Sequence, residues 1–229
     1  MGRAIAGGLV EKGAIAAKHI AVYDVDADRQ EQARDLGATV HGSPPELAAA
    51  CDVLVLAVKP QSVDEALEQL KPGLTPRTLI VSIAAGISIT FIAKRLGEQT
   101  RIVRVMPNMP AMVNAGAAGV ALGPNCTGDD ERIARAIFES IGVVECVDES
   151  LIDAVTALSG SGPAYFFYMV ECLVKAAQQH GLTEQQATTL AAQTLIGSGL
   201  LLRESGETAA TLRERVTSKG GTTEAALRT

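Results

Sequence analysis

Short apolar runs alternate with amphipathic helical segments over residues 1–148, and this alternation is the strongest constraint on the fold. The runs at 52–58 and 78–83 are apolar on nearly every residue, as expected for strands buried on both faces of a parallel sheet. Helical segments follow them at 62–70 and 88–96. Strands that alternate with helices in this way form βαβ units, so the pattern predicts an α/β fold with a doubly wound parallel sheet.

The remaining elements of this region fit the same scheme. They are strands at 19–24, 101–106 and 142–147, helices at 27–36 and 129–141, and a Gly/Ala-rich run at 115–123. Beyond residue 148 only helical patterns occur. Helices are expected at 161–179, 183–204 and 208–216, with a fourth starting near Thr222. The chain is therefore predicted to join a Rossmann-like α/β region to an all-α region.

Composition excludes several classes of function. The net charge is −6, no run of Lys or Arg occurs and only 3% of the residues are aromatic, which argues against nucleic-acid binding. No apolar stretch reaches the roughly 18 residues of a membrane span, and no signal peptide opens the sequence. The four cysteines and three histidines are scattered, without metal-ligand spacing. We therefore expect a cytoplasmic protein that binds no metal, membrane or nucleic acid.

The first residues resemble the end of a dinucleotide-binding turn. Met1 and Gly2 open a helical segment, but the strand and the first two glycines of a G-x-G-x-x-G fingerprint are missing, so the sequence looks trimmed at its start. Asp24 ends a strand about twenty residues later, where this fold places a carboxylate on the ribose. Met1, Gly2 and Asp24 are thus candidate cofactor residues. A solvated Asp24, or Arg29 paired with a phosphate, remains an alternative.

Three later loops follow predicted strands. The carboxyl ends of parallel strands are where this fold binds ligands, and three such loops in succession favour a cleft over loop geometry alone. The candidate cofactor-binding residues in these loops are Ala57, Val58, Lys59, Pro60, Ala84, Ala85, Gly86, Met106, Pro107 and Asn108.

Seven motifs occur in an order that resembles the pyrroline-5-carboxylate reductases. They are Ala57–Pro60, Ser82–Gly86, Met106–Asn108, Val113–Gly116, Ser159–Tyr165, Leu190–Thr194 and Ser218–Thr223. The resemblance runs from Met1 to Thr229 and implies a Rossmann-like domain at 1–148, lacking its first strand, and a helical dimerisation and substrate-binding domain at 149–229. It also implies reduction of 1-pyrroline-5-carboxylate to L-proline with NADP(H) or NAD(H), the last step of proline biosynthesis, in a homodimer that can assemble further.

The same resemblance places the substrate at the loop Ser218–Thr223. Its glycines expose N–H groups before a helix, which suits a carboxylate, and the Thr223 hydroxyl is the candidate catalytic group at the imine nitrogen. The candidate substrate-binding residues are Ser218, Gly220, Gly221, Thr222 and Thr223. A plain glycine break with Thr222 as the N-cap is the alternative.

The sequence departs from the family pattern at two further places, and two alternative functions stay open. Lys219 stands where the family usually has proline, and the last helix looks cut short after Thr229. A β-hydroxyacid dehydrogenase would carry a lysine after a glycine-rich helix entry, and residues 160–167 contain none, which favours imine chemistry. A non-catalytic dinucleotide-binding protein would not need the loop at 218–223.

Overall fold

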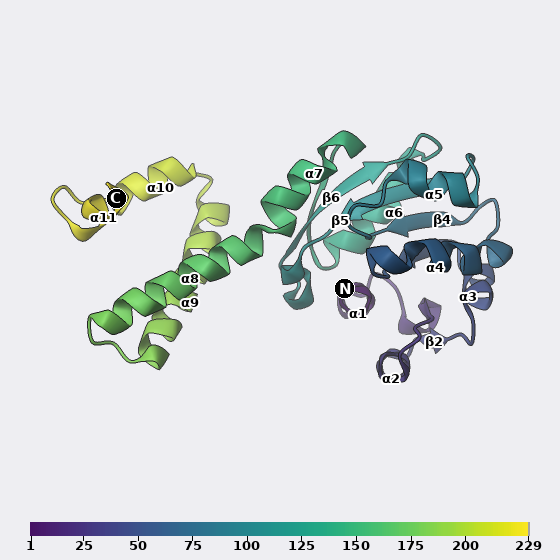
Figure 1. The fold of residues 1–229 in the computed structure, drawn as a ribbon, viewed down its shortest axis with the longest axis horizontal. Helices are drawn as coiled ribbons and strands as arrows, with labels where there is room; N and C mark the ends of the chain where they lie inside the picture. The colour runs from purple at the N-terminus through teal and green to yellow at the C-terminus, as the bar shows by residue number, and fades with distance from the viewer. Residues whose placement is uncertain (229) are drawn as a thin grey trace. The chain divides into compact units, whose positions relative to one another are not determined.

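The structure is a computed structural model that describes residues 1–228. Its chain forms two compact units, the first spanning Met1–Pro163 and the second beginning at Ala164 (Figure 1). Each unit is considered by itself.

Two sheets form the centre of the first unit. The larger one holds its strands in chain order: β3 (Val53–Leu56), β4 (Leu79–Ser82), β5 (Arg101–Met106), β6 (Gly116–Leu122) and β7 (Gly142–Cys146). The smaller one pairs β1 (Ala21–Val22) with β2 (Thr39–Val40) in parallel. β3, β4 and β5 are parallel to one another, β6 is antiparallel to β5, and β7 is parallel to β6.

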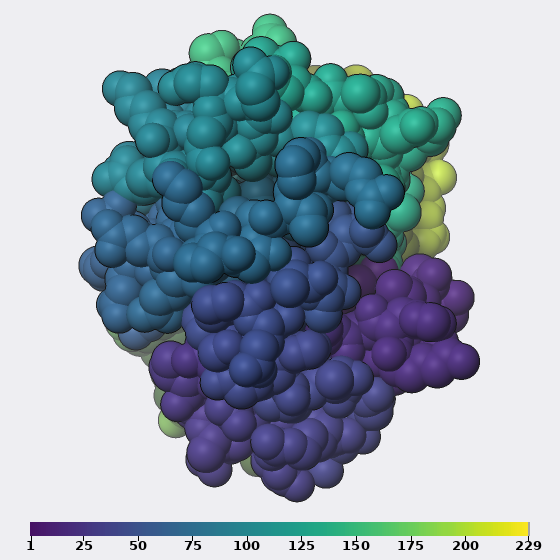
Figure 2. Space-filling view, turned by 90° about the vertical axis from the view of Figure 1, so that its right-hand side faces the viewer, coloured from purple at the N-terminus to yellow at the C-terminus, as the bar shows by residue number. Residues whose placement is uncertain are grey.

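Helices connect these strands. They are α1 (Gly2–Glu11), α2 (Ala27–Asp35), α3 (Pro44–Ala50), α4 (Val63–Leu70), α5 (Ile89–Leu96), α6 (Gly128–Glu139) and α7 (Ile152–Val155). Short 3₁₀ helices span Ala17–His19, Pro60–Ser62, Lys71–Gly73, Met109–Val113 and Glu149–Leu151, and a π-helical turn spans Thr156–Gly160. In the space-filling view, the N-terminal residues (purple) flank the dark-blue residues that follow them (Figure 2).

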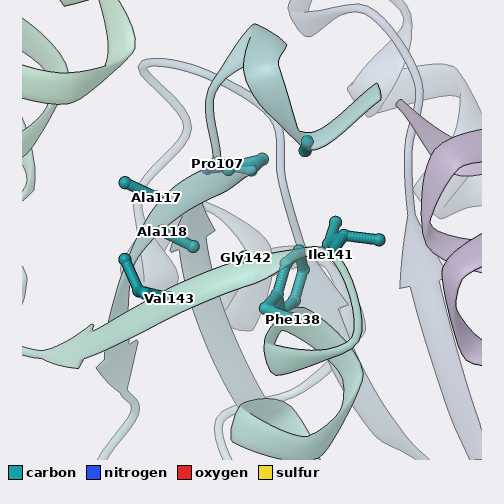
Figure 3. Close-up of a pocket in the computed structure, with 9 residues that line it drawn as sticks. Pro107, Ala117, Ala118, Phe138, Ile141, Gly142 and Val143 are labelled. Carbon is teal, nitrogen blue, oxygen red and sulfur yellow. The ribbon is translucent and has the colours of Figure 1, made fainter. Parts of the chain in front are cut away.

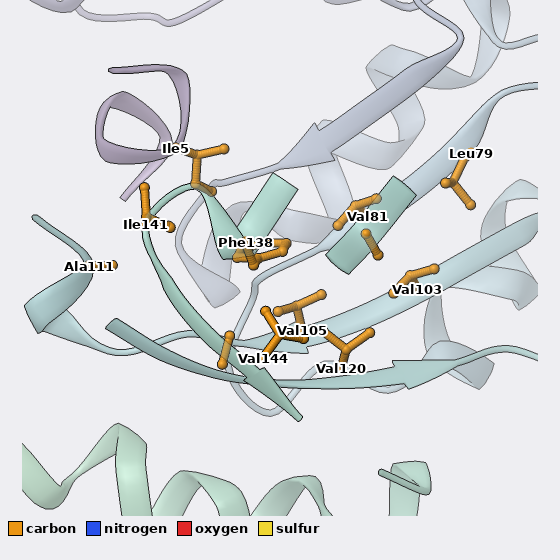
Figure 4. Packing of buried hydrophobic residues seen from close by; sticks show 12 residues of the cluster. Ile5, Leu79, Val81, Val103, Val105, Ala111, Val120, Phe138, Ile141 and Val144 are labelled. Atoms are coloured by element: carbon orange, nitrogen blue, oxygen red, sulfur yellow. The ribbon is translucent and has the colours of Figure 1, made fainter. Parts of the chain in front are cut away.

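The sheet is buried on both faces because successive residues of β4 and β5 enter different hydrophobic clusters. Val81 and Val105 pack with Ile5 of α1 and Phe138 of α6 (Figure 4). Ile80 packs instead in a second cluster with residues of α3, α4 and α5. Side chains of a strand alternate between faces, so helices on both sides are required to cover such strands. The predicted fold class, a Rossmann-like doubly wound domain followed by a helical one, is confirmed.

One detail of the predicted sheet is wrong. The Gly/Ala-rich run becomes β6, which returns antiparallel to β5, so the sheet is mixed rather than wholly parallel. Only residues 107–115, with a single short 3₁₀ helix, lie between the two strands. A parallel return needs a crossover of about a dozen residues or more, so this connection is too short for one.

The second unit is helical. Its elements are α8 (Gly162–Gln179), which begins just before the unit boundary, α9 (Glu184–Ser205), α10 (Ala209–Arg215) and α11 (Thr222–Leu227). Thr183 and Gln186 form a reciprocal capping box at the start of α9, and Gly206 ends α9 in the left-handed conformation with φ of 69°. These helices lie within about two residues of their predicted positions, the usual disagreement at helix ends.

Segment 149–163 packs with the first unit, because α7 contacts β5 and β6. The predicted domain boundary after residue 148 stays a prediction. Among the described residues, no helix is both long and apolar enough to cross a membrane.

A buried carboxylate joins α6 to the sheet. Asp130 is fully buried; its Oδ1 accepts a hydrogen bond from Arg101 Nη1 of β5 at 2.7 Å. Its other oxygen accepts from the backbone N–H of Thr127 at 2.8 Å and completes the capping box of α6. The Asp130 side chain thus caps α6 and neutralises the charge of Arg101 on β5.

Asp130→Ala should lower the free energy of unfolding by roughly 2–4 kcal/mol, because it leaves Arg101 and the Thr127 N–H without their partner. The neighbouring Asp129 forms an exposed pair with Arg132, so Asp129→Ala should cost under about 1 kcal/mol. Urea unfolding of both variants measures the difference. Equal losses would show that the buried contacts of Asp130 do not stabilise the unit.

Candidate active site

The loops that follow β3, β4 and β5 leave the sheet at one edge. Leu56 pairs with Ser82 and Ser82 pairs with Arg104, so the carboxyl ends of these parallel strands are aligned. The structure therefore brings to one edge the predicted cofactor residues Ala57, Val58, Lys59, Pro60, Ala84, Ala85, Gly86, Met106, Pro107 and Asn108. Gly86 has φ of 74°, a conformation that an L side chain rarely adopts.

The start of α1 lies against the first of these loops. A Cβ added at Gly2 would come within 3.3 Å of the Ala57 Cβ, a tight contact, so the start of the helix packs closely against this loop. The N-cap Met1 provides no side-chain cap, and the first turn of α1 holds no acidic residue. Its N–H groups and the helix dipole suit a phosphate, so Met1 and Gly2 fit a dinucleotide.

Asp24 lies in the turn between β1 and α2. Its Oδ1 accepts the backbone N–H of Asp26 at 3.0 Å, and its Oδ2 lies 3.6 Å from Arg29 Nη1. Arg29 is shared, because its Nε lies 3.6 Å from Asp26 Oδ2. A hydrogen bond of 3.1 Å from Arg3 of α1 to Gln32 of α2 links this segment to the first helix. The structure therefore places the Asp24 carboxylate beside Arg29, the residue that one sequence alternative pairs with a phosphate.

Asn108 has its amide engaged within the fold. Its Nδ2 donates to the backbone oxygen of Ser159 at 3.1 Å, and its Oδ1 accepts from the backbone N–H of Ala117 at 2.9 Å. The side chain is buried and ties the end of β5 to β6 and to the π-helical turn. π-helical turns often mark functional sites. The amide of Asn108 therefore shapes the loop, while its backbone lies at the sheet edge.

A narrow crevice, too tight to admit a water molecule, lies beside this loop at the starts of β6 and β7 (Figure 3). Pro107, Ala117, Ala118, Phe138 and Val143 contribute to its lining. The lining carries no titratable side chain, so the crevice offers apolar contact and no acid, base or nucleophile.

The loop Ser218–Thr223 lies in the second unit. Gly220 has φ of 74°, and the Gly221 N–H donates to the Ser218 backbone oxygen at 2.9 Å. Gly221 is the N-cap of α11, so the alternative that Thr222 caps this helix is wrong. Thr223 is half-buried in the first turn.

Sequence reasoning missed one contact of this loop. The Gly220 N–H donates to Glu224 Oε2 at 2.6 Å. The signal was present in the sequence, since an acid three residues after an N-cap commonly bonds back to the chain before the helix.

Clustered metal-ligand side chains and reactive thiols are the other groups that could carry chemistry in a chain of this kind. No group of three or more His, Cys, Asp or Glu side chains in the described part of the chain is placed to hold a metal ion. Burial raises the pKa of the Cys51 and Cys126 thiols, which keeps them protonated and poorly nucleophilic. The residues instead suit a dinucleotide at the sheet edge and an anion at the glycine loop.

Comparison with known proteins identifies the family. One family model, described as pyrroline-5-carboxylate reductase dimerisation, matches residues 149–229, and another, described as NADP oxidoreductase coenzyme F420-dependent, matches residues 1–86. The pyrroline-5-carboxylate reductase of Methanosarcina acetivorans is 39% identical over 97% of this chain and 83% of its own length.

Solved structures agree with this result. The pyrroline-5-carboxylate reductase from Coxiella burnetii is 37% identical with a TM-score of 0.93, over 99% of this chain and 85% of that one. The Plasmodium falciparum pyrroline carboxylate reductase with NADP bound is 30% identical with a TM-score of 0.87, over 98% and 83%. The predicted resemblance is confirmed: this chain belongs to the pyrroline-5-carboxylate reductase family.

Proposed function

We propose that this protein reduces 1-pyrroline-5-carboxylate to L-proline by hydride transfer from NAD(P)H, the last step of proline biosynthesis. The observation that carries the proposal is full-length similarity to pyrroline-5-carboxylate reductases across both units. The reaction adds a hydride to the imine carbon and a proton to the ring nitrogen. It therefore needs a cofactor site, a grip on the substrate carboxylate and a hydrogen-bonding group near the nitrogen.

The sheet edge of the first unit is the proposed cofactor site. The N-terminal turn of α1, with Met1 and Gly2, suits the pyrophosphate, and the small residues Ala84, Ala85 and Gly86 after β4 let a dinucleotide lie against the backbone. NAD(P)H supplies the hydride when it is bound. The NADP in the Plasmodium falciparum relative supports this choice of cofactor.

The loop Ser218–Thr223 is the proposed substrate site. Backbone N–H groups and the Ser218 hydroxyl are suited to the carboxylate, and the Thr223 hydroxyl is suited to donate to the imine nitrogen. Residues 160–167 hold no lysine or histidine that could act as the base of an alcohol oxidation. An imine is protonated readily from a hydroxyl or from water, so this composition favours imine reduction over β-hydroxyacid oxidation.

Consumption of NADPH in the presence of 1-pyrroline-5-carboxylate, followed by absorbance, tests the proposed activity. Thr223→Ala should lower kcat/KM for the imine by roughly 1–3 kcal/mol in activation free energy, the usual cost of losing a hydrogen bond to a charged partner. The KM for NADPH should stay unchanged, and Thr223→Ser should retain most of the activity. Loss of NADPH binding with intact imine affinity would mean that the loop serves the other ligand.

Cofactor preference is a separate proposal. A free Asp24 carboxylate would bind a ribose diol and repel a 2′-phosphate, while Arg29 at 3.6 Å offsets part of that charge. We propose that NADH is used at least as well as it is in typical relatives.

Asp24→Ser should shift the ratio of kcat/KM for NADPH over NADH toward NADPH by roughly 1–3 kcal/mol, because it removes a like charge near the phosphate. Arg29→Ser should shift the ratio the other way, since Arg29 neutralises Asp24. The ratio is measured on both variants and the unchanged protein. If it stays the same in all three, Asp24 does not contact the ribose.

We propose that the helical unit forms a homodimer, which is the minimal assembly and can associate further. Large apolar side chains on α8 and α9 are exposed in the single chain, among them Phe166, Phe167, Leu173, Ile196 and Leu201. Exposed apolar areas of this extent mark association surfaces. The match to a dimerisation family model over residues 149–229 points the same way.

Light scattering at micromolar concentration should therefore show a dimer or a larger assembly. Phe167→Asp should weaken it by placing a charge on the apolar surface, whereas Gln178→Glu, a charge on the polar part of the same helix, should have little effect. A stable monomer of the unchanged protein would contradict this proposal.

We also propose a cytoplasmic location. NAD(P)H is a cytoplasmic reductant, and the four cysteines are all free thiols, which a reducing compartment preserves.

A further inference from the structure

The Glu224 carboxylate accepts a hydrogen bond from the proposed substrate loop. Its Oε2 accepts from the Gly220 N–H at 2.6 Å, while its Oε1 accepts from Arg228 Nη2 at 2.6 Å. The Glu224 side chain is 30% exposed, and Arg228 is largely exposed at the C-cap position that follows the helix. The carboxylate therefore bridges the loop before α11 and a cation after it.

The Gly220 N–H donates to the Glu224 carboxylate rather than to a backbone oxygen. The neighbouring Gly221 N–H is already satisfied by the Ser218 backbone oxygen at 2.9 Å. The left-handed conformation of Gly220, with φ of 74°, sets the direction of the turn. An N–H of this kind is a strong partner for a carboxylate, because hydrogen bonds to charged acceptors are about twice as strong as neutral ones.

A substrate carboxylate at this loop would meet the Glu224 carboxylate at the same donor. One N–H cannot serve both at full strength, and two carboxylates within a few ångströms repel each other. We propose that Glu224 competes with the substrate carboxylate for Gly220 and so limits substrate affinity. Arg228 stays paired with Glu224 when the substrate displaces it, which lowers the cost of the exchange. This inference rests on the proposed placement of the substrate at Ser218–Thr223.

L-Proline, the product, and L-prolinamide, which lacks the carboxylate, are suitable probes for titration calorimetry. Glu224→Ala should tighten L-proline binding about three- to tenfold, the effect of removing one competing charged hydrogen bond at a partly exposed site. Glu224→Gln keeps the length of the side chain, removes its charge and should give a smaller gain in the same direction. L-Prolinamide binding should not change in either variant. Glu204→Gln, on exposed α9 and paired with Arg203, is the control and should alter neither ligand.

Steady-state kinetics on the same variants separates the possible outcomes. The inference expects a lower KM for 1-pyrroline-5-carboxylate with an unchanged KM for NADPH. Unchanged or weaker L-proline binding in both Glu224 variants, with normal thermal unfolding and retained turnover, would show that Glu224 only caps the helix, and the inference fails alone. Equal gains for L-proline and L-prolinamide would show that the effect is not one of carboxylate competition. Absence of both turnover and proline binding in the unchanged protein would overturn the proposed function, and this inference with it.

Discussion

Burial of β4 and β5 on both faces determines where the chemistry of the first unit can take place. Leu79, Ile80 and Val81 of β4 are almost wholly inaccessible to solvent, and they alternate between two hydrophobic clusters. Helices must then cover both sides of the sheet, so the polar backbone at the carboxyl ends of the strands is left at one open edge. The loops that follow β3, β4 and β5 lie at that edge because the strands are aligned there. The place of the proposed cofactor site thus follows from how the sheet is buried.

The burial of the strands on both faces also explains why part of the fold could be predicted from the sequence. Continuous apolar runs identified β3 and β4 to within about two residues, since only a strand covered on both faces tolerates such a pattern. The direction of β6 could not be predicted, because a Gly/Ala-rich run has no alternation and its pairing depends on the length of the preceding loop. Asn108 was placed correctly at the end of a strand, but the two bonds of its amide depend on Ser159 and Ala117, which no local pattern connects to it.

The loop Ser218–Thr223 was only partly predictable from the sequence. Its position and its helix were readable from the residues, and its role as a substrate site came from the resemblance. An acid three residues after the N-cap was the available sequence signal, but the structure was needed to show that Glu224 bonds to Gly220 instead of pointing to solvent. Residues 160–167 contain no lysine or histidine that could act as a base, so the proposed role of the loop is to bind a carboxylate rather than to take part in general-base catalysis.

The central claim is that hydride reaches the carbon of a cyclic imine. Mass spectrometry of the product formed from 1-pyrroline-5-carboxylate and NADPH deuterated at its transferable hydrogen tests this most directly. The account predicts L-proline carrying one deuterium at the former imine carbon, formed in equal amount to the oxidised cofactor. Proline without deuterium, or cofactor oxidation without proline, would contradict it.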